Sequence, residues 1–472
     1  MGVSAEKLRA VQKREFFRRG ITFAVMSGVC YGLYTGFLTL AETQGPWGMW
    51  FGDGMGLSAF TVTFALAALA AGLNDLWSGV WSVVSCAVHG QLGDLGKTVR
   101  TKPGHVMMLC AVVGGPLATV CYVVGLNSAA AAGAPGIIVP IAALNCAIGA
   151  VLGRVLFKQE LAPHAVAGIV VCLAAGMLIG GASFASVGSE ALVGCLFAFL
   201  AAFGWGFEGC VAGFGTVLID YRIGIAIRQV TAGVLELMVM FPVLAAIGDG
   251  LSSVPTLLGT ALSDPSLLIF AVSGLFAMPA YSFWYKGNSM CGTALGMACN
   301  GMYAFWGPFF IWVILGVLNV GGMGASYPPL SAAQWTGALI MVFGIFVIAV
   351  SPASLFGRRE SVGVTPEAER PVDAEACSRF RVVDSSLPLY YSILRYFEGG
   401  AIGDAVGVVH ALQSAYAGSR QLTESHVGEA LATAKENGLL DEVGCEQGDG
   451  ERLRVLYRMN DFGREMVTRY IR

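Results

Sequence analysis

Three carboxylates within long apolar segments are the residues of this chain best suited to chemistry. Asp75, Glu208 and Glu236 each stand among hydrophobic side chains. An ionised group in hydrocarbon costs about 2.5–3.5 kcal/mol even on lenient insertion scales, so such residues tend to line cavities and to carry function. A carboxyl group removed from water also exchanges protons more readily near neutral pH. These residues predict proton coupling or recognition of a cation; pairing with Arg222, Arg228 or a helix carbonyl is the purely structural alternative.

Aromatic residues near Glu208 add to this interpretation. Trp205 lies three residues before Glu208, and Tyr31 lies in a segment that matches this one in the repeat described below. An aromatic face beside a carboxylate holds an organic cation by cation–π contact plus charge. Ordinary packing in the core or against lipid is the alternative for both aromatic residues.

Two amides and one more tyrosine complete the candidate site. Asn145 and Asn300 fall in the middle of apolar segments, where an amide must find a hydrogen-bonding partner. That partner is either another helix or a bound solute, and Tyr303 is a candidate of the same kind. The candidates for substrate binding or coupling are Tyr31, Asp75, Asn145, Trp205, Glu208, Glu236, Asn300 and Tyr303.

The sequence offers no pattern of an enzyme or of a metal site. It contains neither a phosphate-binding P-loop nor an HExxH motif. His89, His105 and His164 are far apart and form no recognisable ligand set. Most cysteines fall in apolar segments, where thiols act as small hydrophobes. We therefore predict no catalytic residues, no metal, no cofactor and no enzymatic activity.

The composition is that of a membrane protein. Of 472 residues, 56% are hydrophobic and only 12% are charged, and the mean hydropathy is +0.68. Ten apolar segments have roughly the length needed to cross a bilayer. We place these segments at 20–41, 58–88, 104–126, 130–157, 162–182, 189–218, 223–247, 266–290, 292–316 and 331–352.

Positive charges fix the orientation of these segments. Every Lys and Arg before residue 360 falls at one face of the predicted bundle or on the helix ends that open onto it, including Arg222 and Arg228 at the start of the seventh segment. The positive-inside rule then puts both termini in the cytoplasm. We predict a multi-pass protein of the cell membrane.

Internal similarity divides the membrane part into two halves. Ala71–Asp75 matches Ala232–Glu236, and Asn127-Ser128 matches Asn288-Ser289, each pair 161 residues apart. A unit of five segments is odd, so the second copy enters the membrane from the opposite side. Inverted repeats with a site near the midplane are a design of secondary transporters.

The run Tyr122–Leu161 carries a family resemblance. Its Gly-Leu-Asn-Ser start at Gly125, its Gly-Ile-Ile-Val-Pro centre at Gly136 and its Phe-Lys-Gln-Glu-Leu end at Phe157 resemble the drug/metabolite transporter superfamily, EamA type. The resemblance covers roughly residues 20–352 and implies the five-plus-five plan and transport of a small solute. The second half departs from the pattern, because it reads Leu-Gly-Val-Leu-Asn at 315–319 where the first half has Glu160.

The C-terminal part is polar and looks separately folded. We expect helices at 389–397, 402–416 and 423–436, a hairpin from 438 to 457, and a last helix capped by Asn460. The stretch from Val427 to Tyr470 resembles a winged-helix module. Residues 360–472 carry 12 basic and 18 acidic side chains, which disfavours nucleic acid as a partner because DNA affinity depends on neutralising phosphates.

Together these observations predict an all-α polytopic membrane protein with ten transmembrane helices in two inverted five-helix repeats, plus a small α+β winged-helix-like cytoplasmic domain. We predict a secondary active transporter of a small organic metabolite or drug-like solute, working by alternating access and coupled to protons or another ion. The alternative is a membrane-embedded ligand sensor that signals through the C-terminal domain. The expected partners are a small-molecule solute and membrane lipids. The sequence leaves undecided whether the chain forms a homodimer. The predicted regions are a basic N-terminus 1–19, repeats 20–182 and 189–352, a linker 353–386 and the C-terminal domain 387–472.

Overall fold

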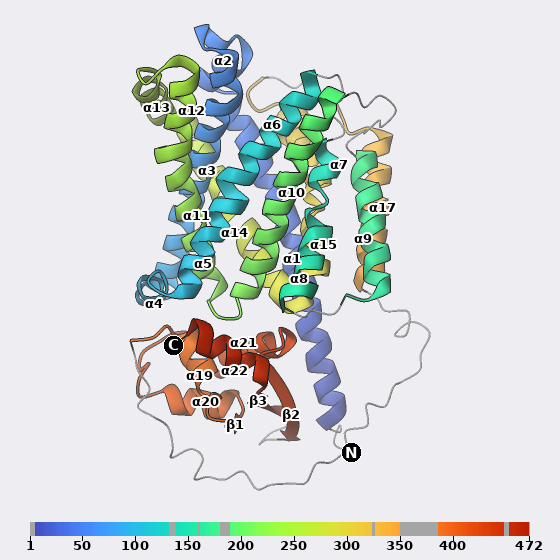
Figure 1. The fold of residues 1–472 in the computed structure, drawn as a ribbon, viewed down its shortest axis with the longest axis vertical. Coiled ribbons are helices and arrows are strands. Elements are labelled where there is room, and N and C mark those ends of the chain that lie inside the picture. Colours follow the sequence, from blue (N-terminus) through green and yellow to red (C-terminus); the bar gives the residue numbers. More distant parts are fainter. Residues whose placement is uncertain are drawn as a thin grey trace.

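A helical bundle and a smaller domain below it make up the structure (Figure 1). The computed structural model describes residues 5–131, 138–157, 161–179, 189–322, 326–349, 386–447 and 453–471. Glu160 and all but the last residue of the predicted linker 353–386 lie outside the described residues.

The first half of the bundle is built almost entirely from helices. Its longest element is α1, which runs without a break from Ala5 to Glu42. The elements that follow are α2 (Gly45–Gly52), η1 (Gly54–Gly56), η2 (Thr61–Ala65), α3 (Leu66–Val88), α4 (Leu92–Thr98), α5 (Lys102–Val112), η3 (Val113–Leu117), α6 (Ala118–Ala131), α7 (Ile138–Ala142), α8 (Asn145–Phe157) and α9 (Pro163–Ile179).

The second half is also helical; one π-helical turn interrupts its segment 221–249 and another ends its segment 303–317. The elements are α10 (Ser189–Gly215), α11 (Tyr221–Leu235), η5 (Glu236–Met240), α12 (Phe241–Asp249), α13 (Ser253–Ser263), α14 (Ser266–Cys291), α15 (Thr293–Asn300), α16 (Tyr303–Ile311), η6 (Trp312–Val317) and α17 (Ala332–Ala349). Helices thus occupy each of the ten ranges predicted to cross the membrane.

Among the described residues, seven helical segments are long and apolar enough to span a membrane, so the chain has the build of a multi-pass membrane protein. They are Lys7–Glu42, Lys102–Gly125, Leu192–Gly215, Tyr221–Asp249, Ser266–Cys291, Thr293–Val317 and Ala332–Ala349. The apolar helices Asn145–Phe157 and Pro163–Ile179 are shorter. Ten crossings, and the orientation of the termini, stay predictions.

Small residues let the helices approach closely. A Cβ atom on Gly32 of α1 would lie 2.5 Å from the Cβ of Trp306 in α16, and one on Gly344 of α17 would lie 2.7 Å from Cys172 Sγ in α9. In Figure 1, α9 and α17 form a pair beside the rest of the bundle. The glycines therefore serve packing, as small residues do at membrane helix contacts.

The C-terminal domain combines helices with a small antiparallel sheet. Its elements are α19 (Leu389–Arg395), β1 (Ile402–Gly403), α20 (Ala405–Leu412), α21 (Glu424–Glu436), β2 (Leu440–Gln447), β3 (Leu453–Met459) and α22 (Asp461–Tyr470). The strand order is β1-β3-β2, with Leu440 opposite Met459. The helix predicted at 402–416 is wrong at its start, because Asp404 accepts the Gly407 N–H at 2.8 Å and caps α20 after a short strand.

The C-terminal domain rests on the end of the bundle, with α21 turned toward it (Figure 1). Glu429 of α21 accepts hydrogen bonds from Lys286 Nζ at 2.6 Å and from an Arg19 guanidinium nitrogen at 2.9 Å. Asn437 donates to the Ser289 carbonyl at 2.7 Å. If the domain were a DNA-binding winged helix, α21 would be the helix that enters a groove of DNA. In this structure α21 instead contacts the bundle.

A half-buried histidine lies at this junction. His426 Nε2 lies 3.7 Å from Asp220 Oδ2. Burial lowers the pKa of His426, and Arg222 and Lys286 act in the same direction while Asp220 and Glu429 oppose it. The imidazole is therefore neutral in the docked domain and takes up a proton more readily in the unfolded chain. Its contribution to stability is present above its ordinary pKa of about 6.5 and decreases as the pH falls below it.

Acidification is accordingly expected to loosen the C-terminal domain. Between about pH 7.5 and about pH 5.5, amide hydrogen exchange in 424–437 should accelerate, because protonation favours the undocked histidine. In His426→Gln the acceleration over the same range should be smaller. An identical pH response in both chains would contradict the assignment to His426.

Candidate functional site at the centre of the bundle

A buried arginine between two carboxylates lies at the centre of the site. Arg228 is 2% exposed. Its Nε donates to Glu208 Oε1 at 2.7 Å, and its Nη1 donates to Asp75 Oδ2 at 2.8 Å. The expectation that Arg228 opens onto the cytoplasmic face is therefore wrong. Asp220 caps α11 at its start, and the seven helical steps from Tyr221 to Arg228 carry the guanidinium about 10 Å into the bundle.

Neighbouring polar groups satisfy the remaining donors and acceptors. The Tyr285 hydroxyl donates to Glu208 Oε1 at 2.7 Å. Gln229, which accepts a hydrogen bond from Arg228, donates to Ser78 Oγ at 2.7 Å. With both carboxylates ionised, this centre carries one more negative than positive charge. A single proton or a bound cation would neutralise it.

A glycine allows Glu208 to reach this position. A Cβ atom on Gly114 would lie 1.9 Å from Glu208 Oε2 and 2.6 Å from its Cβ. Gly114 belongs to the π-helical turn η3, where the next residue, Gly115, has φ −87° and ψ −106° and Pro116 lacks the N–H that a regular helix would use. The irregular backbone and the missing side chain together leave room for the carboxylate.

Gly114→Ala should therefore displace Glu208 from Arg228. We expect a loss of about 1–3 kcal/mol in the free energy of unfolding, the usual cost of inserting a methyl group into a filled interior. Thermal unfolding of the purified chain would measure it. Gly259→Ala in α13 is the matched control, because no atom lies within 4 Å of its added Cβ, and it should not destabilise the chain.

Tyrosines from three helices, α1, α14 and α16, gather beside the charged centre. The ring of Tyr31 lies 4.5 Å from that of Tyr34, 4.6 Å from that of Tyr303 and 6.1 Å from that of Tyr281. The Arg228 guanidinium lies 4.2 Å from the Tyr281 ring centre. Tyr31, Tyr281 and Tyr303 remain half-buried. The predicted residues Tyr31 and Tyr303 thus lie together, and Tyr281 connects them to Arg228.

Other predicted residues lie apart from this centre. Trp205 contacts the Tyr122 ring at 5.4 Å. Asn300 donates to Ser27 Oγ at 2.7 Å and so joins α15 to α1, which is the helix–helix alternative. Asn145 is buried at the start of α8. Trp205 and Asn300 thus make contacts between helices.

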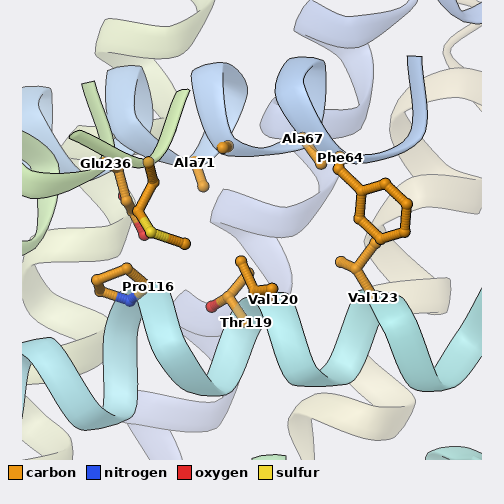
Figure 2. A pocket seen from close by; sticks show the side chains of 10 residues that line it. Phe64, Ala67, Ala71, Pro116, Thr119, Val120, Val123 and Glu236 are labelled. Atoms are coloured by element: carbon orange, nitrogen blue, oxygen red, sulfur yellow. The ribbon is translucent and has the colours of Figure 1, made fainter. Parts of the chain in front are cut away.

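Glu236 lies in different surroundings from its repeat partner Asp75. The two residues are on packed stretches of helix, since a Cβ on Gly72 would lie 3.1 Å from the Glu236 Cβ. Glu236 is 3% exposed, and its Oε2 has no hydrogen-bond partner among the residues that the structure describes. It borders a small open hollow that is also lined by Phe64, Pro116 and Val123 (Figure 2). Only Asp75 of this pair bonds to Arg228.

Sequence reasoning missed several parts of this centre. Gln229, Ser78 and Tyr285 complete the hydrogen bonds of Arg228 and Glu208. One available signal was the Arg-Gln pair two turns into an apolar helix, since an arginine at that depth needs acceptors on neighbouring helices.

Comparison with known proteins leaves the family open. No protein-family model matches the chain, and no curated protein matches it. Among solved structures, one described as "Crystal structure of protein" aligns with a TM-score of 0.47 and 19% sequence identity, covering 71% of this chain and 98% of that one. A similarity of this size does not identify a family.

Proposed function

We propose that the chain is a secondary transporter of a small organic metabolite or drug-like solute, of the EamA type in the drug/metabolite transporter superfamily. The observation that carries the proposal is Arg228 held between Asp75 and Glu208 in the middle of an apolar bundle. A buried ion pair contributes little to stability and is often no better than an apolar replacement. In a membrane bundle, such groups are typical of ion and substrate pathways.

The charge of the centre suits coupling to one proton or cation. Two carboxylates face one guanidinium, so the centre alternates between a net charge of −1 and neutrality when a single proton binds or leaves. The two states differ in which helices are held together, because Arg228 on α11 bonds to Asp75 on α3 and to Glu208 on α10. Protonation of either carboxylate weakens one of these links. This is the property that alternating access requires.

The tyrosine cluster supplies the adjoining solute surface. Tyr31, Tyr281 and Tyr303 come from α1, α14 and α16, so a solute against their rings would touch helices of both halves of the bundle. Aromatic faces bind organic cations and apolar rings, and hydroxyl groups add hydrogen bonds.

A flux measurement in proteoliposomes tests this function. The purified chain would be reconstituted, and uptake of a panel of organic solutes would be measured with and without an imposed pH gradient. Glu208→Gln should abolish gradient-driven uptake, whereas Asp53→Asn, which makes the same charge change at an exposed position after α2, should leave it intact. Saturable binding without flux across the panel would contradict transport.

The docked C-terminal domain favours a second function, that of a membrane sensor. Its contacts with α1 and α14 would pass a change in the bundle to the cytoplasm. Truncation after about residue 360 separates the two proposals. A transporter retains solute flux without the domain, whereas a sensor has no flux to retain and loses its output.

A further inference from the structure

Three π-helical turns from different parts of the chain meet at one hollow. Phe64 belongs to η2, Pro116 to η3, and both Glu236 and Met240 to η5, and all four residues border it. A π-helical turn is rare and is found frequently at functional sites, because it costs regular hydrogen bonds. Three of them around a single hollow indicate that this region is shaped for a purpose other than packing.

The hollow presents one polar end and a long apolar wall. Figure 2 shows Glu236 and Pro116 toward one end and Phe64 and Val123 toward the other. Ala67, Ala68, Ala71, Thr119 and Val120 line the space between them. The small alanines leave room there, so the wall is smooth and apolar along the α3 side.

At the polar end of the hollow, Glu236 has a hydrogen-bond acceptor atom without a partner among the described residues. Its Oε2 is buried without a hydrogen-bond partner in the described part of the chain, and leaving such an atom unpaired costs about 1–3 kcal/mol. Arg228, the cation of the neighbouring centre, already bonds to Asp75 and Glu208. No group among the described residues is thus left to pair with Glu236 Oε2, so the atom is available to a bound ligand.

The hollow also lies close to the outer surface of the bundle. Leu117, next to Pro116, is 50% exposed, and Val239, next to Met240, is 48% exposed. In a bilayer these side chains face the lipid. A ligand dissolved in the membrane would reach the hollow by displacing a few apolar side chains.

We propose that this hollow binds a small amphipathic ammonium ion, with its N–H groups donating to Glu236 and its apolar body lying along Phe64, Val120 and Val123. An N–H donor with positive charge satisfies the carboxylate, and an apolar body matches the remaining wall. The site is separate from the Arg228 centre. This proposal rests on the proposed function in so far as it names a substrate class for the transporter.

Binding of 2-phenylethylammonium to the purified full-length chain tests the proposal. Calorimetric titration would be run on the wild type, Glu236→Gln, Ala67→Phe and Asp53→Asn, each checked first for a single folded species. Glu236→Gln should weaken binding at least 10-fold by removing the charge. Ala67→Phe should do the same by filling the hollow. Asp53→Asn removes one negative charge at an exposed position after α2 and should bind as the wild type does.

Two further ligands separate charge from shape. The wild type should bind the uncharged analogue 2-phenylethanol at least 10-fold more weakly than it binds the ammonium ion. The affinity for 2-phenylethanol should be the same in Glu236→Gln as in the wild type. Benzyltrimethylammonium, which has the charge but no N–H, should bind more weakly than 2-phenylethylammonium. Equal affinity of the ammonium ion for the wild type, Glu236→Gln and Ala67→Phe, or no binding to any of them, would overturn the proposal.

The two proposals fail in different ways. Solute flux that Glu208→Gln abolishes, together with no binding of 2-phenylethylammonium, overturns the hollow as a site and leaves transport standing. Binding that depends on Glu236 without flux of any solute supports the hollow and overturns transport.

Discussion

Arg228→Met is expected to lower the free energy of unfolding by about 3–5 kcal/mol, because it leaves Asp75 and Glu208 buried without their counter-charge. Methionine keeps the length and the apolar stem of the side chain, so the change isolates the guanidinium. The midpoint of thermal unfolding in detergent measures the loss. Arg222→Met, six residues earlier on the same helix and 24% exposed, should cost less than about 1 kcal/mol.

A second substitution distinguishes lost pairing from lost packing. If the unpaired carboxylates cause the damage, Glu208→Gln and Asp75→Asn placed in the Arg228→Met background should each recover part of the stability. Both neutral side chains retain a hydrogen-bonding oxygen. A double-mutant cycle with no coupling between Arg228 and Glu208 would contradict the ion pair as the source of the effect.

Glu429→Lys is expected to release the C-terminal domain from the bundle. The carboxylate of Glu429 bonds to Lys286 and Arg19, and a lysine there would face two like charges. Burial alone would raise the pKa of Glu429, but Lys286 and then Arg19 outweigh it, and the net shift is downward. The carboxylate is therefore ionised at neutral pH. Reversing its charge should weaken docking by about 2–5 kcal/mol.

Hydrogen exchange at the two sides of this junction would report the release. Peptides covering 97–105 and 286–291 of the bundle, together with 424–437 of the domain, should all exchange faster in Glu429→Lys. Glu446→Lys makes the same charge change at an exposed position on β2 and should leave these peptides unchanged. Faster exchange confined to 424–437 would mean local unfolding of α21 instead of undocking.

The helices of this protein could be predicted from the sequence because each follows from a run of apolar residues. Helix is present in the described part of each of the ten predicted ranges, and the predicted cap Asn460 accepts the Gly463 N–H at 2.8 Å. Local chemistry decides both features. The strand at Ile402 was missed because its pairing with Arg458 depends on residues far away in the chain.

The candidate site could be predicted only in part, for the same physical reason. Its carboxylates were found because a charge in an apolar segment is costly wherever it lies. Its partners could not be found, because the contacts of Arg228 depend on how α3, α10 and α11 cross. The π-helical turns around Glu236 depend likewise on Pro116 and on neighbouring helices, and no regular period in the sequence reveals them.

The unbroken helix α1 gives this molecule a lever arm. Its 38 residues extend about 57 Å, so that Tyr31 in the tyrosine cluster and Arg9 beside Glu442 of the C-terminal domain belong to one stiff rod, about 33 Å apart. If a bound solute tilts α1 by about 10° around Tyr31, Arg9 moves sideways by about 6 Å. A rearrangement of a few rings in the bundle would thereby be enlarged into a displacement wide enough to part the salt bridge between Arg9 and Glu442.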